Sequence, residues 1–351
     1  MSTPAERLRR RIRSGGVVPF AIFMEEALYG EGGYYARGEL PIGRDGDFVT
    51  GSSYSPLFGE ATARILRRLD GVLGRPADFL EVGYGSGAHL RAVLATVGGA
   101  GPRRVWGWER RPRSLPAPAR SIDDLAEIGE GTVEGLIFSY ELFDALPVHR
   151  LIGSEEGLGE LWVDLGEDDS FRFVEGELSE PSLSRLLADG GTSLEPGQIA
   201  DLSPGWQPLY RQLAERLGRG LLVTFDYGFE SERLLDARVR SLGTLACYRH
   251  QRVHRDPFIQ VGEQDLTAHV DFSSLRAAGE EAGLETIAFT PQARWLGASG
   301  IFEGLAGAEP ERRLEAMTLL DPGGMGEEIR VLVQGRGVEP GELFDLEILA
   351  G

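Results

Sequence analysis

The stretch 78–97, which reads DFLEVGYGSGAHLRAVLATV, decides the fold. Its first five residues, 78–82, form an apolar run with the length of a buried strand. Three glycines then alternate with single residues, and 88–97 has the composition of a helix. A strand, a glycine turn and a helix in this order bring backbone N–H groups close to a ligand. The stretch therefore predicts a Rossmann-like α/β fold with a ligand at the turn.

Other short apolar runs extend this unit into a sheet. Helical segments lie between them, which predicts a mostly parallel sheet with crossover connections. A further helix is expected at 57–73, before the first strand. The additional strands are expected at 104–108, 135–140, 220–225, 284–289 and 329–334.

The remaining segments predict additions to this α/β core. A helical N-terminal extension or lid is expected at 1–75, and the α/β domain at 76–351. Two insertions, at about 151–205 and 229–282, are long enough to form a lid or a substrate site. Within the first insertion, a β-hairpin is expected from the runs 161–165 and 171–174.

The N-terminal segment is rich in arginine and can be interpreted in two ways. One interpretation is a transit peptide. The other is the polar face of a first helix, because Leu8 and Ile12 are four residues apart and patterned sequence follows directly. We favour the helix. A bacterial cytoplasmic location is expected, and a mitochondrial one stays open.

The composition excludes several kinds of chemistry. The chain has 351 residues and a net charge of -19, and its 36 basic residues are all arginine. Without lysine there is no Schiff-base, P-loop or kinase lysine. The single Cys247 cannot form an internal disulfide or a multi-cysteine zinc site. No apolar run reaches the roughly 18 residues of a membrane span, and the acidic charge disfavours nucleic acid and favours basic partner proteins.

Two carboxylates near the glycine turn indicate which ligand it takes. Gly83, Gly85 and Ala88 fit the G-x-G-x-x-A pattern of dinucleotide sites, so an NAD-dependent oxidoreductase is one interpretation. Glu81, however, disfavours a pyrophosphate and favours an ammonium group. Glu109 follows the second strand, where an acidic residue accepts hydrogen bonds from ribose hydroxyls. Together they favour S-adenosylmethionine over NAD, while a purely structural turn stays open.

The loop 141–149, ELFDALPVH, follows the expected strand 135–140 and carries two acidic residues, Glu141 and Asp144. In open α/β sheets, ligands bind beyond the carboxyl ends of the strands, so both residues would face a methyl donor. Carboxylates match the planar fork of a guanidinium, which suggests an arginine acceptor. Asp144 can equally be an ordinary helix N-cap.

The histidines give weaker signals. His250 and His254 are four residues apart, but the neighbouring arginines disfavour a metal ion, and we expect none. His269 is either a buried core residue or a base on the substrate side.

Nine segments in this order resemble the MidA-like family of class I methyltransferases. Mitochondrial members of that family are linked to assembly of respiratory complex I through dimethylation of a protein arginine. The resemblance implies a seven-stranded sheet with an antiparallel last strand, S-adenosylmethionine as methyl donor, and a segment ending at Thr50 that helps to close the cofactor site. The segments are 33–35, 46–50, 57–60, 81–88, 141–147, 225–228, 243–250, 265–272 and 325–327.

The chain departs from the family pattern at several positions. Ser53 lies where relatives carry a carboxylate, Tyr84 and Ser86 replace proline and arginine in the turn, and Tyr140 replaces asparagine. The last change would put a bulky ring beside the methyl-transfer centre. A factor that binds S-adenosylmethionine and assists complex assembly without turnover therefore stays open, as does a small-molecule methyltransferase.

We accordingly predict a methyltransferase that transfers a methyl group from S-adenosylmethionine to an arginine of a basic partner protein. A homodimer stays open. Glu141 and Asp144 are expected to orient the acceptor. The expected cofactor-binding residues are Glu81, Gly83, Gly85, Gly87, Glu109, Asp123, Asp124 and Thr50.

Overall fold

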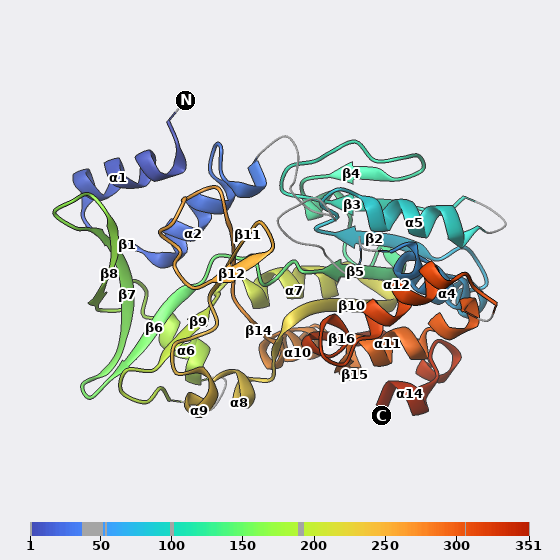
Figure 1. Ribbon diagram of the computed structural model, residues 1–351. Helices are drawn as coiled ribbons and strands as arrows, with labels where there is room; N and C mark the ends of the chain where they lie inside the picture. Colours follow the sequence, from blue (N-terminus) through green and yellow to red (C-terminus); the bar gives the residue numbers. More distant parts are fainter. Residues whose placement is uncertain are drawn as a thin grey trace. The chain divides into compact units, whose positions relative to one another are not determined.

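The computed structural model describes residues 2–36, 52, 55–98, 102–188, 193–305 and 307–350. The chain divides into two compact units, each built from several segments. Unit 1 contains Met1–Phe48, Phe143–Gln207 and Gly228–Ser274, and unit 2 contains Val49–Leu142, Pro208–Tyr227 and Leu275–Gly351. The elements of each unit are labelled in Figure 1. As domain boundaries, the division at residue 75 and the two expected insertions stay predictions.

Unit 2 holds the central sheet. Within the described residues its strands are ordered β15-β16-β10-β5-β2-β3-β4. The pairs from β4 to β10 are parallel, whereas β16 is antiparallel to both of its neighbours. These seven strands form the predicted Rossmann-like sheet with an antiparallel last strand, and β14 (Val270–Asp271) pairs with the end of β10 as an eighth strand. The strands are β2 (Asp78–Val82), β3 (Val105–Trp108), β4 (Arg120–Ile122), β5 (Val133–Tyr140), β10 (Leu217–Phe229), β15 (Glu285–Pro291) and β16 (Ile329–Arg336).

All six predicted strands of this sheet are present, and the helix predicted at 57–73 is α4 (Pro56–Leu73). The sequence did not reveal β4, a three-residue strand without an apolar run. The other helices of this part of the chain are α5 (Ala88–Val97), α7 (Trp206–Arg216), α10 (Phe272–Glu281), α11 (Gln292–Ala298), α12 (Pro310–Leu320), α13 (Met325–Glu328) and α14 (Leu346–Ala350), with 3-10 turns η2 (Leu125–Glu127), η3 (Ile301–Gly304) and η4 (Pro340–Glu342).

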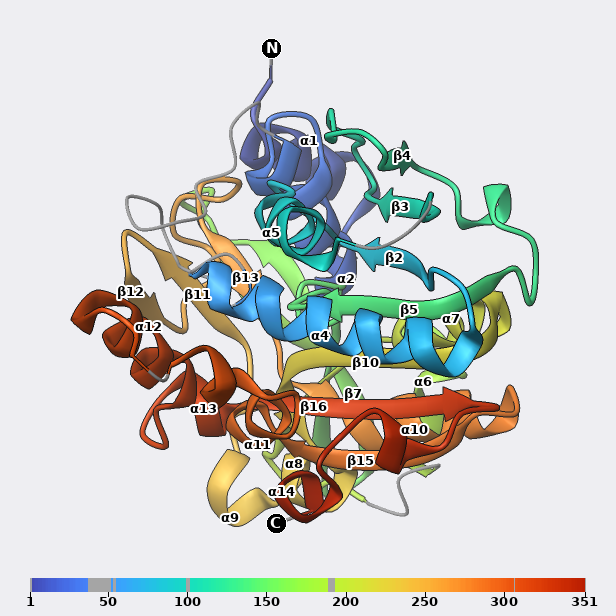
Figure 2. The same ribbon diagram turned by 90° about the vertical axis from the view of Figure 1, so that its right-hand side faces the viewer.

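Helix α4 covers the middle of the sheet, as Figure 2 shows. It begins with Pro56 after Ser55, whose hydroxyl accepts a hydrogen bond from the Leu57 amide at 3.2 Å. Its buried Phe58 packs edge-to-face against Phe138 of β5 and Phe225 of β10, with ring centroids 6.1 and 5.2 Å apart. An aromatic core therefore fixes α4 against β5 and β10. Strand β5 is followed by the acidic loop 141–149.

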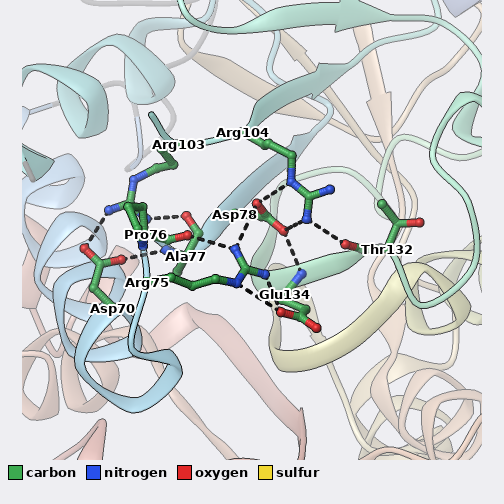
Figure 3. Close-up of polar contacts among 9 residues, drawn as sticks. All are labelled: Asp70, Arg75, Pro76, Ala77, Asp78, Arg103, Arg104, Thr132 and Glu134. Carbon is green, nitrogen blue, oxygen red and sulfur yellow. Dashed lines mark hydrogen bonds and ion pairs between the residues drawn. The ribbon is translucent and has the colours of Figure 1, made fainter. Parts of the chain in front are cut away.

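The amino ends of β2, β3 and β5 are joined by charged side chains. Asp78 is 1% exposed and accepts hydrogen bonds from Arg104 Nε at 2.8 Å and from the Glu134 amide at 2.9 Å. Arg75 lies between the carboxylates of Asp78 and Glu134 (Figure 3). Arg103 pairs with Asp70 at 2.7 Å. We call this set of ion pairs the amino-edge cluster; it fixes the register of three neighbouring strands.

Among the described residues, unit 1 contains a five-stranded antiparallel sheet, a three-stranded sheet ordered β12-β11-β13, and helices. Strands β1, β7, β6 and β9 are ordered side by side, and β8 pairs with β7 as the predicted hairpin. A capping box between Thr3 and Glu6 begins the first helix, which buries Leu8 and Ile12 as the helical interpretation requires. The elements are α1 (Pro4–Gly15), β1 (Val18–Pro19), α2 (Phe20–Tyr29), η1 (Tyr34–Ala36), β6 (His149–Ser154), β7 (Gly157–Leu165), β8 (Phe171–Gly176), α6 (Leu183–Ala188), β9 (Ile199–Leu202), α8 (Ser231–Leu234), α9 (Ala237–Arg240), β11 (Ala246–Arg249), β12 (Arg252–His254), β13 (Asp265–Thr267) and β14 (Val270–Asp271).

Candidate active site

The candidate site lies at the carboxyl ends of the parallel strands. The chain proceeds from β2 outward to β3 and β4 and then returns to β5 on the other side of β2. The order of the strands thus reverses between β2 and β5, which is where ligands bind in open α/β sheets. The loops after β2, β3 and β5 begin with Gly83, Glu109 and Glu141. The predicted residues therefore meet at the expected edge of the sheet.

The glycine turn has a backbone that only glycine adopts easily. Gly83, Gly85 and Gly87 have φ angles of +70°, +50° and +71°, in the left-handed region. A Cβ atom on Gly83 would come within 2.9 Å of the Leu142 side chain in the loop after β5. The turn is thus close-packed against the second loop of the switch point, as a backbone cradle for a ligand requires.

Glu109 is joined directly to this turn. Its Oε2 accepts a hydrogen bond from the Gly85 amide at 3.1 Å, and its Oε1 accepts one from the Arg110 amide at 3.0 Å. Burial raises the pKa of the Glu109 carboxyl, and these two hydrogen bonds partly offset that rise. The carboxylate keeps further lone pairs, since each oxygen can accept more than one hydrogen bond.

Glu81 is a buried carboxylate in the middle of this region, 5% exposed at the end of β2. Its Oε1 lies 3.2 Å from His89 Nδ1, and His89 Nε2 lies 3.0 Å from the Thr62 hydroxyl. Its Oε2 has no hydrogen-bond partner among the described residues. A buried carboxylate oxygen is costly without a donor, so this atom fits the ammonium group of S-adenosylmethionine.

The remaining predicted cofactor residues have different environments. Asp124 caps η2, since its Oδ1 accepts a hydrogen bond from the Ala126 amide at 2.8 Å. The neighbouring Asp123 has an exposed side chain, and its carbonyl accepts a hydrogen bond from Trp108 Nε1 at 3.1 Å. Of these two predicted cofactor residues, Asp123 is therefore the better candidate to bind the adenine of S-adenosylmethionine. Thr50 and Ser53 lie outside the described residues.

The acidic loop begins at Glu141 with a strained backbone. Glu141 has a φ of +48°, which costs a residue with a side chain free energy and is typical of functional sites. Its amide donates to the Phe225 carbonyl at 2.9 Å. The next amide, that of Leu142, donates to Asp226 Oδ2 at 3.2 Å. Asp226 is fully buried and was missed as a site residue, although it belongs to the recognised segment 225–228.

Asp144 belongs to unit 1 and is 4% exposed there. Its carbonyl accepts a hydrogen bond from the Ala268 amide at 2.9 Å. Two tyrosines lie near it. Tyr29 donates to the Ala145 carbonyl at 2.8 Å, and Tyr35 donates to Asp265 Oδ2 at 2.9 Å. Burial first, and then the charge of Asp265, raise the pKa of Tyr35, with a further contribution from Asp144. We call Tyr29, Tyr35, Asp144 and Asp265 the tyrosine–carboxylate cluster.

Two departures from the family pattern have structural explanations. Tyr84 is buried, and its hydroxyl lies 2.6 Å from Ser121 Oγ and accepts a hydrogen bond from the Arg113 amide. Tyr140 packs edge-to-face on Phe58 and donates its hydroxyl hydrogen to Gln292 Oε1 at 2.8 Å. The side chain of Tyr140 is part of the aromatic core, and its expected place beside the methyl-transfer centre stays a prediction. The side chain of Ser86 is exposed.

The histidines lie in different local surroundings. His250, with a φ of +48°, lies in the turn between β11 and β12, and Cys247 pairs across these strands with His254. Within the described ranges no group of three or more His, Cys, Asp or Glu could hold a metal ion. Burial lowers the pKa of His269 to about 4, with Arg240 adding to the effect. A base of this strength takes up protons poorly at neutral pH.

The sheet order and the carboxyl-edge site define a class I methyltransferase that uses S-adenosylmethionine. A family described as "Putative S-adenosyl-L-methionine-dependent methyltransferase" matches residues 108–290, and the chain belongs to this family. The chain is thus a MidA-like methyltransferase dependent on S-adenosylmethionine, as the resemblance implied.

Known proteins similar to this chain agree with this assignment. A protein from Burkholderia thailandensis, crystallised with bound S-adenosyl-homocysteine, is 29% identical with a TM-score of 0.86, over 96% of this chain and 92% of that one. The Drosophila melanogaster protein named "Protein arginine methyltransferase NDUFAF7 homolog, mitochondrial" is 29% identical over 95% of this chain and 85% of its own length. The Mus musculus protein named "Protein arginine methyltransferase NDUFAF7, mitochondrial" is 27% identical over 80% and 71%. In the part of the chain that the structure describes, no helix is long and apolar enough to span a membrane.

Proposed function

We propose that the chain N-methylates an arginine of a basic partner protein. The observation that carries the proposal is the acidic loop, in which Glu141 and Asp144 are three residues apart at the switch point of a methyltransferase sheet. The names of the similar proteins support an arginine acceptor. The net charge of -19 supports a basic protein as the partner, because an acidic surface attracts it.

The loop is held firmly enough to position an acceptor. In unit 2, the Phe225 carbonyl and the Asp226 carboxylate bind the amides of Glu141 and Leu142. In unit 1, Trp206 Nε1 donates to the Phe143 carbonyl at 2.8 Å. Backbone groups fixed in this way hold the backbone from which the acidic side chains extend, which supports a proposed role in orienting a substrate.

The two acidic side chains have distinct roles in the proposed reaction. Glu141 aligns the guanidinium, because a carboxylate accepts two parallel hydrogen bonds from its planar fork. Asp144 is proposed as the second acceptor, and within its own unit the rings of Tyr29 and Tyr35 stack with their centroids 5.5 Å apart. Aromatic rings attract cations, so the tyrosine–carboxylate cluster suits an arginine better than a neutral side chain.

The cofactor would be held by the residues at the glycine turn. Gly83, Gly85 and Gly87 would form its backbone cradle, Glu81 would accept from its ammonium group, and Glu109 from its ribose hydroxyls. When bound, S-adenosylmethionine supplies an electrophilic methyl group on its sulfonium. Transfer would form a nitrogen–methyl bond, break the sulfur–methyl bond and leave S-adenosyl-homocysteine, and one of the two carboxylates, that of Glu141 or of Asp144, would take the single proton that the guanidinium loses.

The proposal is tested with methyl-labelled S-adenosylmethionine and a protein extract from the source cells. Labelled protein is hydrolysed to amino acids, and the label is expected in methylarginine. Glu141→Gln and Asp144→Asn should each lower labelling by at least a hundredfold, a loss of about 2.7 kcal/mol in transition-state stabilisation. Glu130→Gln, an exposed glutamate in the turn before β5, is the matched control and should label normally.

Other distributions of label would contradict the proposal. Label in small molecules would favour the small-molecule methyltransferase. Calorimetric binding of the donor without any labelled product would favour the assembly factor without turnover. Equal labelling by the wild type and both variants would remove Glu141 and Asp144 from the reaction.

A further inference from the structure

Unit 2 carries a cluster of arginines that the methyl-transfer site does not use. An open cavity of about 290 Å³ is lined by Arg64, Arg67 and Arg68 of α4 and by Glu303 of η3. Arg67 donates to the carbonyl of Thr96 at 2.9 Å, near the end of α5. At 1.5 Å per residue, the eight residues from Ala88 to Thr96 put that carbonyl about 12 Å along the helix from the glycine turn. The cavity is therefore separate from the cofactor site.

Backbone carbonyls hold two of these guanidinium groups in place. Arg68 Nη1 donates to the Leu343 carbonyl at 2.7 Å and to the Ala298 carbonyl at 3.2 Å. Arg67 is fixed by Thr96 in the same way. Carbonyl oxygens orient a guanidinium without neutralising its charge. The cluster is thus preorganised and still positively charged, which is the arrangement of an anion site.

Arg64 lacks an acceptor for part of its guanidinium. Its side chain is 13% exposed, and its buried Nη1 has no hydrogen-bond partner among the described residues. The nearest carboxylate is Glu60, 3.9 Å from Nη2. Glu60 is already bound by both terminal nitrogens of Arg312, at 3.0 and 2.6 Å. A buried guanidinium nitrogen without an acceptor favours an additional, anionic partner.

The charges around the cavity do not balance. Of the four arginines 64, 67, 68 and 312, Arg312 is neutralised by Glu60, and Arg68 lies 3.8 Å from Glu303. Glu303 is 68% exposed and holds Arg68 only at that long distance. Arg64 thus shares Glu60 with Arg312 at the longer distance of 3.9 Å, and Arg67 has no ion pair in the part of the chain that the structure describes. Glu303 is the one lining group that would compete with an anion.

We propose that this cavity binds a tetrahedral oxyanion of the phosphate class, either free phosphate or the phosphate group of a phosphomonoester. Guanidinium forks match the oxygen atoms of phosphate in pairs, and several arginines can bind one such group. A phosphate oxygen would supply the acceptor that Arg64 lacks. The proposal is independent of the acceptor of the methyl group.

The test is calorimetric titration of the full-length protein with inorganic phosphate, at an ionic strength held constant with sodium chloride. Saturable binding of one phosphate per chain is expected. Arg67→Gln should weaken it about tenfold, which corresponds to the loss of one charge-assisted hydrogen-bonded pair. Because Arg67 is exposed, this variant should fold, and unchanged binding of S-adenosyl-homocysteine confirms that it does. Arg64→Gln should give an equal or larger loss.

Two further variants make the result specific. Glu303→Gln removes the competing carboxylate and should tighten phosphate binding several-fold, a gain that general damage cannot produce. Arg185→Gln, which removes an exposed arginine of α6, should leave phosphate binding unchanged. Titration with O-phosphoserine identifies the source: tighter binding than phosphate points to a phosphomonoester, and equal or weaker binding to the free ion. Unchanged affinity in Arg67→Gln, or no saturable heat with either ligand, would overturn the proposal.

Discussion

The two edges of the central sheet differ in how their polar groups are satisfied. At the amino edge, Asp78 accepts from Arg104 and from the Glu134 amide, and Arg75 bridges Asp78 and Glu134. At the carboxyl edge, Glu81 Oε2 is buried without a partner among the described residues, and the backbone of Glu141 is strained. Paired polar groups thus stabilise the sheet at its amino edge. At its carboxyl edge, polar atoms are still able to bind a ligand.

The pKa values of two carboxyl groups differ between the two edges in the same sense. A hydrogen bond from Arg75 lowers the pKa of Glu134 at the amino edge. Burial raises the pKa of Glu109 at the carboxyl edge. The charged form of Glu134 is thus favoured at the edge that stabilises the sheet. The charged form of Glu109 is disfavoured at the edge where a ligand is expected to bind.

The largest effect on folding is expected at the amino-edge cluster. Asp78→Ala leaves the Glu134 amide without its acceptor and leaves Arg104 with only the Thr132 carbonyl, and breaking a buried pair costs about 3–5 kcal/mol. Arg104 is 49% exposed and regains water, so a loss of about 3 kcal/mol in the free energy of unfolding is expected. Urea denaturation measures it. Asp164→Ala, which breaks a surface pair with Arg172, should cost less than about 1 kcal/mol; equal losses would contradict the special role of Asp78.

Glu141→Gly separates function from stability at the carboxyl edge. Glycine adopts a φ of +48° without strain, so the free energy of unfolding should rise by about 1 kcal/mol. Turnover should fall at least a hundredfold, because the carboxylate is lost. Thermal unfolding and methyl transfer are measured on the same sample. A variant that is less stable than the wild type would show that the side chain of Glu141 stabilises the fold instead.

Donor binding should depend on pH through Glu109. The pKa of Glu109 is raised in the folded protein, so its contribution to stability is present at low pH and is lost as the pH rises through the raised pKa. The ribose hydroxyls need the ionised form of Glu109. The affinity for the donor should therefore fall as the pH is lowered, by up to about tenfold per pH unit below the raised pKa. Titrations with S-adenosyl-homocysteine across the acidic range measure this. A pH dependence that persists in Glu109→Gln would assign it to another group.

The smallest effects are expected after β4, where two neighbouring aspartates have different surroundings. Asp124→Ala removes the cap of η2 and should cost about 1 kcal/mol or less of stability, with no change in donor affinity. Asp123→Ala should leave stability unchanged and weaken donor binding. Denaturation and calorimetry of both variants test this, and reversed roles would contradict the assignment of Asp123 to the adenine side.

The sequence predicted the parts of the fold that repeat a local pattern. The apolar runs of β2, β5 and β16 are recognisable because strands buried on both faces are continuously apolar, and the glycine turn is recognisable from the spacing of its glycines. Strand β4 was missed because three mixed residues in it carry no such pattern. The pairing of β6 with β9 was missed because 47 or more residues separate their partners, such as Ile152 and Ile199.

The candidate site could be predicted only where a residue type at a given position points to a single chemical role. Glu81, Glu109 and Glu141 follow directly from strand ends. Asp226 was missed because its task, holding the Leu142 amide, depends on contact between two strands distant in sequence. The packing of Tyr140 in the aromatic core was not predicted, because strand position does not tell which face of the sheet a ring covers.

The most direct test of the central claim compares one substitution at the two edges. Wild type, Glu109→Gln and Glu134→Gln are titrated with S-adenosyl-homocysteine by calorimetry at neutral pH. We predict that one S-adenosyl-homocysteine binds per chain, with at least a tenfold loss of affinity in Glu109→Gln and no loss in Glu134→Gln. Equal affinities in the two variants, or a larger loss in Glu134→Gln, would contradict the assignment of the cofactor site to the carboxyl edge.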